Sequence, residues 1–93
     1  MKNVIGKGKL RKYFSISLKA LKEASKVINK KKSKEAEIIL DMADRYLKDA
    51  KYFMEKGDYV NAFAAINYAH GWLDTGSRLG IFKVKNSDIF VIS

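Results

Sequence analysis

The chain has 93 residues, 47% of them hydrophobic and 31% charged, which is typical of one folded domain with a modest core. It contains no cysteine, which excludes disulfides, thiolate chemistry and cysteine-based zinc sites, and no proline, which fits long uninterrupted helices. No window approaches the ~18–20 apolar residues that span a membrane, and the N-terminal residues lack the apolar core of a secretory signal. We therefore expect a cytoplasmic protein.

The net charge of +9 is unevenly distributed along the chain. Residues 1–34 hold twelve Lys or Arg residues against one acid, Glu23, a local charge of +11. Residues 35–93 hold seven basic and nine acidic residues, a local charge of −2. This asymmetry indicates a polyanionic partner, either nucleic acid or an anionic membrane surface. The alternative is a lysine-rich solubilising surface, as in proteins from hot environments.

Residues 1–8, with Gly6 and Gly8 among lysines, are expected to form a flexible basic lead-in. From residue 9 to 29, apolar residues recur at intervals of three, four or seven, which predicts an amphipathic helix with a wide buried face. Basic side chains occupy the opposite side of this helix. The candidate nucleic-acid-binding residues are Lys9, Arg11, Lys12, Lys19, Lys22, Lys26 and Lys30.

A second helix is predicted over residues 34–56, where apolar residues alternate steps of four and three. Ser33 is a good N-cap residue, and Glu35 and Glu37 follow in the first turn, near the positive end of the helix. Gly57 is able to take the left-handed conformation that closes a helix, and Asp58 to cap the next one. The segment Glu55 to Tyr59 is therefore expected to be a corner between helices.

The third helix is predicted over residues 59–79, before Gly80, with small residues that let a neighbour approach closely. Residues 81–93 form an apolar C-terminal extension. Apolar residues alternate with lysines and a turn follows, so a small hairpin is expected there. This extension should pack on the helices or on another copy of the chain. The predicted fold is all-α, with three long antiparallel helices over residues 9–80 in an irregular array or bundle.

The third helix also carries four polar residues that we place opposite its apolar arc: Asn67, His70, Asp74 and Arg78. They form a candidate contact site, with His70 as a contact or acid/base residue. The alternative is a solvent-facing stripe with one ion pair between Asp74 and Arg78. The aromatic residues of the second and third helices are expected in the core, except Phe63, which should project toward the polar side.

The segment from Tyr52 to Gly80, with its pattern YFMEKGDY…AF.AI.YA.GWLD.G.RLG, resembles the signature of a small archaeal family of unknown function. The resemblance covers about residues 10–85. It implies three long helices, including a long α-hairpin, and an archaeal, cytoplasmic origin, but no activity. The same stretch is similar to the helical HEPN domains, some of which are RNases. Their arginine-to-histidine motif requires an arginine a few residues before His70, whereas the nearest is Arg45.

Three functional hypotheses remain open. The leading one is a non-enzymatic binding module whose basic first helix contacts nucleic-acid backbone without sequence specificity. The second is a protein-interaction domain or homodimer that uses the third helix and the C-terminal extension. The third is a HEPN-like RNase that uses His70. No catalytic constellation, metal site or cofactor motif is predicted, because no second histidine exists and no glycine loop has phosphate-binding spacing.

Overall fold

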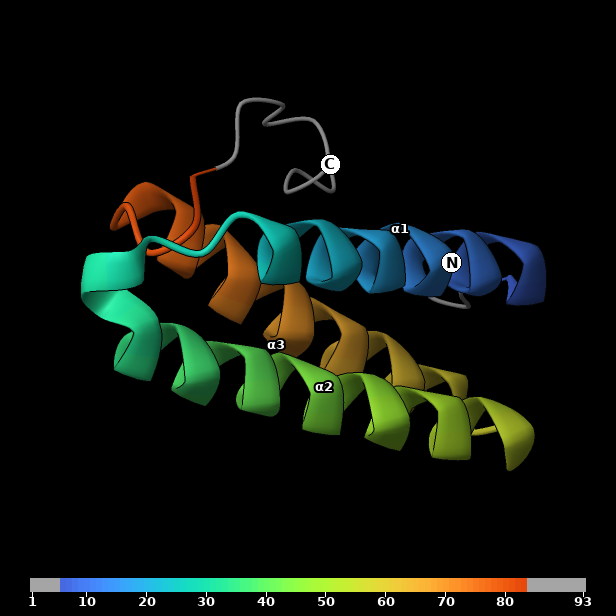
Figure 1. Ribbon diagram of the computed structural model, residues 1–93. Helices are drawn as coiled ribbons and strands as arrows, with labels where there is room; N and C mark the ends of the chain where they lie inside the picture. The colour runs from blue at the N-terminus through green and yellow to red at the C-terminus, as the bar shows by residue number, and fades with distance from the viewer. Residues whose placement is uncertain (1–5, 84–93) are drawn as a thin grey trace.

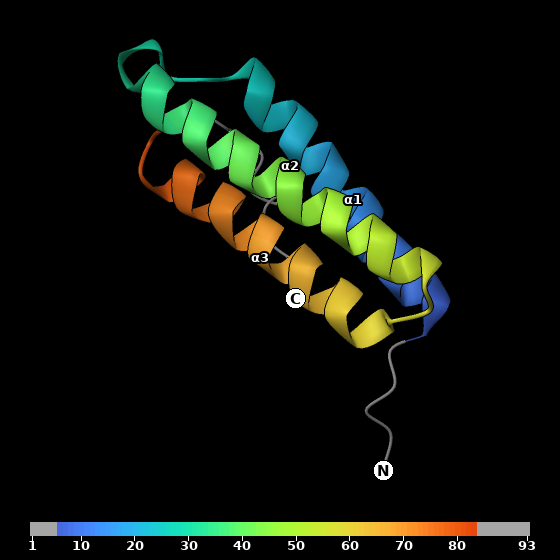
Figure 2. The ribbon, with the colours of Figure 1, turned by 90° about the horizontal axis from the view of Figure 1, so that it is seen from below.

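The computed structural model describes residues 6–83, which form three long helices joined by short turns (Figure 1). Helix α1 spans Lys7–Lys26, α2 spans Ser33–Glu55, and α3 spans Tyr59–Arg78. A short 3-10 helix, η1, spans Lys30–Lys32 between α1 and α2. Neighbouring helices along the chain are antiparallel, so α1 and α3 run in the same direction (Figures 1 and 2). The predicted all-α, three-helix fold is confirmed.

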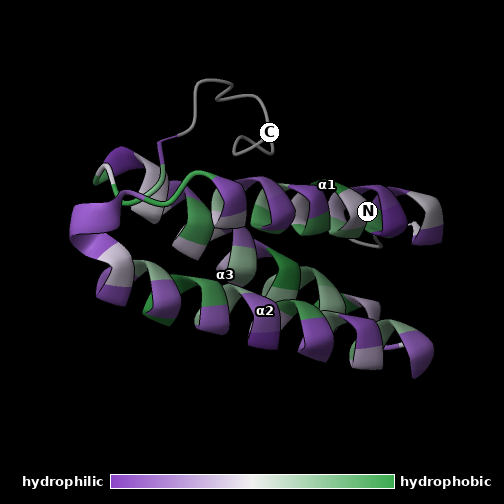
Figure 3. Ribbon diagram, in the orientation of Figure 1, coloured by the Kyte–Doolittle hydropathy of each residue, from purple (hydrophilic) through white to green (hydrophobic). Residues whose placement is uncertain are grey.

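The core lies between the three helices, and α2 and α3 share the most extensive interface. Apolar residues line the inner sides of the helices, and polar residues cover their outer sides (Figure 3). Small residues dominate where the helices meet, and this allows close backbone approach. The alanines that are at most 5% exposed are Ala20, Ala24, Ala36, Ala43, Ala50, Ala62, Ala65 and Ala69. The largest buried apolar side chains include Leu10, Ile66, Leu73 and Phe82.

Helix α1 begins two residues earlier and ends three residues earlier than the sequence predicts. The early start has a packing reason. Leu10 is fully buried and its backbone N–H donates to the Gly6 carbonyl at 3.0 Å, so the turn before it is ordered. The early end reflects a tertiary interaction, because the backbone of residues 27–29 pairs with residues 81–83 instead of continuing the helix.

The predicted N-cap role of Ser33 is wrong. Ser33 has helical dihedrals, φ −64° and ψ −32°, and is the first residue of α2. The preceding η1 leads directly into α2, so the capping interaction moves upstream to Asn29. The Asn29 side chain accepts a hydrogen bond from the Lys31 N–H at 3.1 Å. It also donates through Nδ2 to the Gly80 carbonyl at 3.0 Å.

The corner between α2 and α3 has the expected chemistry. Gly57 adopts the left-handed conformation, with φ +76°, one residue beyond the C-cap Lys56. Asp58 is the N-cap of α3, and its carboxylate accepts hydrogen bonds from the Asn61 N–H at 3.3 Å and from Asn61 Nδ2 at 2.7 Å. These two residues reverse the chain within a short turn.

Beyond α3, the chain turns at Gly80 (φ +75°) and buries Ile81 and Phe82 in the core. We call residues 27–29 together with residues 81–83 the terminal clasp. Its hydrogen bonds run from the Asn29 N–H to the Ile81 carbonyl at 2.8 Å, and from the Lys83 N–H to the Val27 carbonyl at 2.7 Å. Ile81 and Phe82 thus pack on the chain's own helices, the first of the two alternatives. The predicted hairpin and residues 84–93 lie outside the described residues, as do residues 1–5.

Candidate nucleic-acid interface

The seven candidate nucleic-acid-binding residues are all exposed. We call them the basic face: Lys9, Arg11, Lys12, Lys19, Lys22 and Lys26 of α1, with Lys30 of η1. The buried side of α1 consists of Leu10, Ser17, Ala20 and Ala24. At 100° per residue, Lys12, Lys19 and Lys26 fall on one line opposite this buried side. With a rise of 1.5 Å per residue, that line is about 21 Å long.

Acidic side chains offset few of these charges. Glu23 is the one acid in α1, and its Oε1 lies 3.9 Å from Lys26 Nζ. Of the four ion pairs among residues 6–83, none includes Lys9, Arg11, Lys12, Lys19 or Lys22. These five cations are therefore available to an anionic partner.

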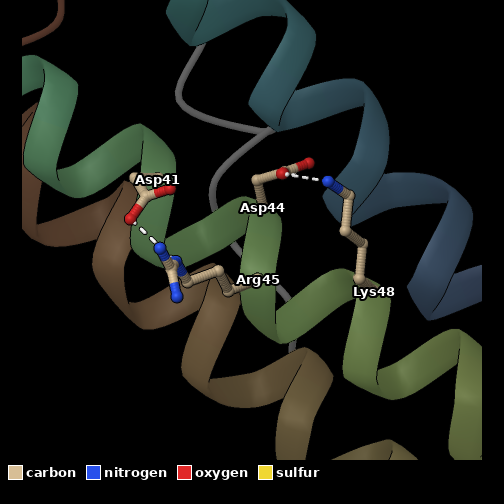
Figure 4. Close-up of polar contacts among 4 residues, drawn as sticks. All are labelled: Asp41, Asp44, Arg45 and Lys48. Atoms are coloured by element: carbon tan, nitrogen blue, oxygen red, sulfur yellow. Dashed lines mark hydrogen bonds and ion pairs between the residues drawn. The ribbon is translucent and has the colours of Figure 1, made fainter.

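Two of the six acids of α2 are engaged with cations of their own helix. Asp41 accepts from Arg45 Nε at 2.9 Å, and Asp44 lies 2.9 Å from Lys48 Nζ (Figure 4). Both pairs link residues one helical turn apart on the surface, where such pairs form readily. Asp41 and Asp44 are thus paired within α2 and do not neutralise the cations of α1.

The four residues of the expected polar stripe do not share one exposed face of α3. Asn67 and Arg78 are exposed, and Arg78 Nε donates to Asp74 Oδ2 at 2.9 Å. His70, however, is only 8% exposed, so its predicted place on a solvent-facing stripe is wrong. It follows the fully buried Ile66 by one turn, and the apolar arc of α3 is wide enough to include it because both α1 and α2 pack on this helix.

Three aromatic expectations also change. Tyr52 of α2, expected in the core, is 56% exposed. Phe63, expected on the polar side of α3, packs against the core, and its ring centroid lies 5.6 Å from that of Tyr13 in α1. Tyr68, expected in the core, is 62% exposed and stacks on Tyr46 of α2, with centroids 5.2 Å apart and planes inclined by 22°. Helical periodicity alone does not show which flank of α3 each neighbouring helix covers.

A shallow depression lies beside this aromatic pair, between α2 and α3, with a volume of about 410 Å³. We call it the aromatic groove. It carries no formal charge on its lining residues, which are Tyr46, Asn67, Tyr68, Gly71, Trp72 and Thr75. Asn67 is the one residue of the expected polar stripe that lines it.

A second cavity, of about 300 Å³, lies where the start of α1 meets the corner between α2 and α3. We call it the basic cavity. Its lining residues are Lys7, Leu10, Arg11, Lys51, Met54, Glu55 and Tyr59. Sequence reasoning missed this cavity, because Lys7 was assigned to the lead-in and Lys51 lies far from α1 along the chain. Only the packing of the helices brings the two residues to one place.

Within residues 6–83, no group of three or more His, Cys, Asp or Glu side chains is placed to hold a metal ion. None of the helices in this part of the chain is long and apolar enough to cross a membrane.

Comparisons with known proteins bear on the family alone. No curated protein and no solved structure matches the chain. The sequence profile of a family described as protein of unknown function, DUF357, matches residues 12–82, from the second turn of α1 to the terminal clasp. Membership of a family of unknown function is thereby confirmed for this three-helix chain, whereas the archaeal origin and the signature motif stay predictions. The match spans most of the chain, which therefore belongs to the DUF357 family of proteins of unknown function.

Proposed function

We propose that this protein is a non-enzymatic module that contacts the backbone of nucleic acid through the basic face. The observation that carries the proposal is the set of exposed cations along α1, five of which are in no ion pair among the described residues. A polyanion that lies along this helix replaces several small counterions at once, and their release drives binding.

Lysine side chains suit phosphate contacts rather than base recognition. An ammonium group is a point charge without the planar donor geometry that reads base edges. Six of the seven residues of the basic face are lysines, and Arg11 is the exception. We therefore propose binding that depends on charge and salt and is largely independent of sequence. We also propose the archaeal origin and cytoplasmic location that the family resemblance implies.

The test is fluorescence anisotropy with short labelled RNA and DNA, single-stranded and duplex, at low and near-physiological salt. One variant carries Lys12→Glu, Lys19→Glu and Lys22→Glu. Its matched control carries Lys34→Glu, Lys48→Glu and Lys56→Glu, which change the net charge equally at exposed positions outside the basic face. Circular dichroism verifies that both variants remain helical.

We expect micromolar or tighter binding by the wild type, lost in the basic-face variant and largely retained in the control. Equal losses in both variants would mean that only net charge matters. An absence of binding at low salt would retire the proposal and leave the lysines as solubilising surface.

A second candidate function, homodimer formation through α3, is favoured by the aromatic groove. Two copies of a chain with a charge of +9 repel each other, and this uncharged patch is a place where they meet little repulsion. Its exposed Tyr68 is an aromatic of the kind enriched at interfaces. Light scattering after size exclusion should show a dimer that Tyr68→Ser weakens. The control Tyr52→Ser, at a residue 56% exposed and outside the groove, should not weaken it.

A further inference from the structure

The basic cavity combines an apolar floor with a cationic rim. Leu10 of α1 is fully buried, and Met54 and Tyr59 are half-buried side chains of the core margin. The rim carries Lys7, Arg11 and Lys51, all exposed, against the single acid Glu55. A ligand that suits both parts has a flat apolar portion and an anionic group.

The charge of the rim limits how much negative charge the anionic group of a ligand carries. Three cations and one carboxylate give a net rim charge of +2. A phosphate monoester carries about −1.5 to −2 at neutral pH, which this rim balances. The volume of about 300 Å³ lies at the lower end for small-molecule sites, which span roughly 300–1,000 Å³. The cavity therefore suits one phosphate and one flat ring system, and not a longer polyphosphate.

The start of α1 carries positive side chains, which are unfavourable at the N-terminus of a helix. Its first turn contains Lys7 and Lys9 and no acid, and Gly6 at the N-cap has no side chain to cap with. Cations near the positive end of a helix are destabilising, because the peptide dipoles there repel them. An anion bound in the adjacent cavity relieves this repulsion. The free protein thus holds a concentration of positive charge at one corner of the bundle.

The cavity is continuous with the basic face, since Arg11 belongs to both. A strand that lies along α1 therefore reaches the cavity without leaving cationic surface. In a duplex the bases are paired and stacked, whereas a single strand has bases free to unstack onto a protein ring.

We propose that the basic cavity binds one nucleotide, its phosphate at Lys7, Arg11 and Lys51 and its base against Tyr59 and Met54. If that nucleotide belongs to a strand held on α1, the inference rests on the proposed function. In that case the nucleic acid bound by the protein is single-stranded. A free nucleoside monophosphate offers the same chemistry. Charge density alone would favour a duplex, because a duplex carries twice the charge per unit of axis length. A preference for single strands is therefore opposite to the one that charge alone predicts.

The experiment compares wild type with Lys51→Glu and Tyr59→Leu in the full chain. Each has a matched control: Lys34→Glu, the same charge change at the far end of α2, and Tyr59→Phe, which keeps the ring. The probes are a labelled single strand, its duplex and adenosine monophosphate, followed by anisotropy for the strands and by calorimetry for the mononucleotide. Thermal melts confirm that each variant folds.

For the wild type we expect the single strand to bind about tenfold more tightly than the duplex, which is the scale of stacking one base on an aromatic ring. Lys51→Glu and Tyr59→Leu should abolish this difference and leave duplex affinity within twofold. Lys34→Glu and Tyr59→Phe should preserve it. Equal wild-type affinity for single strand and duplex, or equal weakening of both by Lys51→Glu, would overturn the inference while leaving the basic face intact.

The mononucleotide separates the two sources of ligand. Binding of adenosine monophosphate that Lys51→Glu removes, without binding of either strand, would support the cavity as a site for free nucleotides and reject the proposed function. Strand binding that basic-face reversal removes but cavity variants leave unchanged would reject the cavity alone.

Discussion

The ring of Phe82 lies against the backbone of Gly76. A Cβ built on Gly76 would come within 2.5 Å of Cε2 and 2.7 Å of Cδ2 of that ring, and within 3.2 Å of Ile39 Cδ1. The Gly76 carbonyl also accepts hydrogen bonds from the N–H groups of Ile81 at 2.8 Å and Phe82 at 3.4 Å. The segment after α3 thus packs directly against the backbone of Gly76.

Gly76→Ala should destabilise the protein, because Phe82 is only 1% exposed and has little room to shift. We expect a loss of about 1–3 kcal/mol in the free energy of unfolding, the usual cost of overpacking. Gly71→Ala is the control in the same helix. No heavy atom lies within 4 Å of its added Cβ, so it should stabilise α3 by up to about 1 kcal/mol. Urea unfolding followed by circular dichroism measures both, and equal effects would contradict the packing argument.

Gly57→Ala should cost about 1–2 kcal/mol, because φ is +76° and L-residues are disfavoured there. The open space around Gly57 makes this a backbone effect without a steric one. Gly57→Asn should cost less, since asparagine tolerates the left-handed region. Thermal melts of the two variants should rank them in this order, and a larger loss for asparagine would refute the assignment.

Ser17→Ala should leave stability unchanged or raise it by up to about 1 kcal/mol. Ser17 is fully buried, and its Oγ has no hydrogen-bond partner among residues 6–83. A buried hydroxyl without a partner loses its hydration on folding, and alanine removes that cost and favours the helix. Chemical denaturation measures the change. A loss above about 1 kcal/mol would reveal an interaction of Ser17 beyond the described residues.

The salt dependence of nucleic-acid binding should report how many lysines contact phosphates. On duplex DNA, the slope of log affinity against log salt should fall in magnitude by about 0.9 for each contacting lysine removed. Lys19→Ala and Lys22→Ala should each produce this change, because both are exposed and outside the ion pairs of residues 6–83. Lys48→Ala, whose partner is Asp44, should leave the slope unchanged.

Much of the fold could be predicted because local chemistry decides it. The absence of proline, the apolar periodicity of each helix and the corner at Gly57 and Asp58 all specify structure over a few residues. The exposure of the basic face followed for the same reason, since lysines opposite an apolar row must face solvent.

What failed depends on contacts between distant segments. The end of α1 is set by the terminal clasp. His70 is buried because both α1 and α2 pack against α3. The basic cavity likewise requires α1 to meet the end of α2. No periodicity within one helix specifies these relationships. The sequence therefore placed Arg11 among the exposed cations but did not indicate that Lys7 and Lys51 lie beside it.

The terminal clasp also governs how the molecule opens. Next to it, the hydrogen bond from Asn29 Nδ2 to the Gly80 carbonyl joins positions 51 residues apart and ties the end of α1 to the end of α3. Helix α1 is therefore unable to detach from the α2–α3 pair at this end unless the clasp breaks and Phe82 leaves the core. In native-state hydrogen exchange, the amide protons of Asn29 and Lys83 should be as slow as those of mid-helix residues. Helix ends ordinarily fray first, whereas we expect this end of the bundle to open only when the whole molecule unfolds.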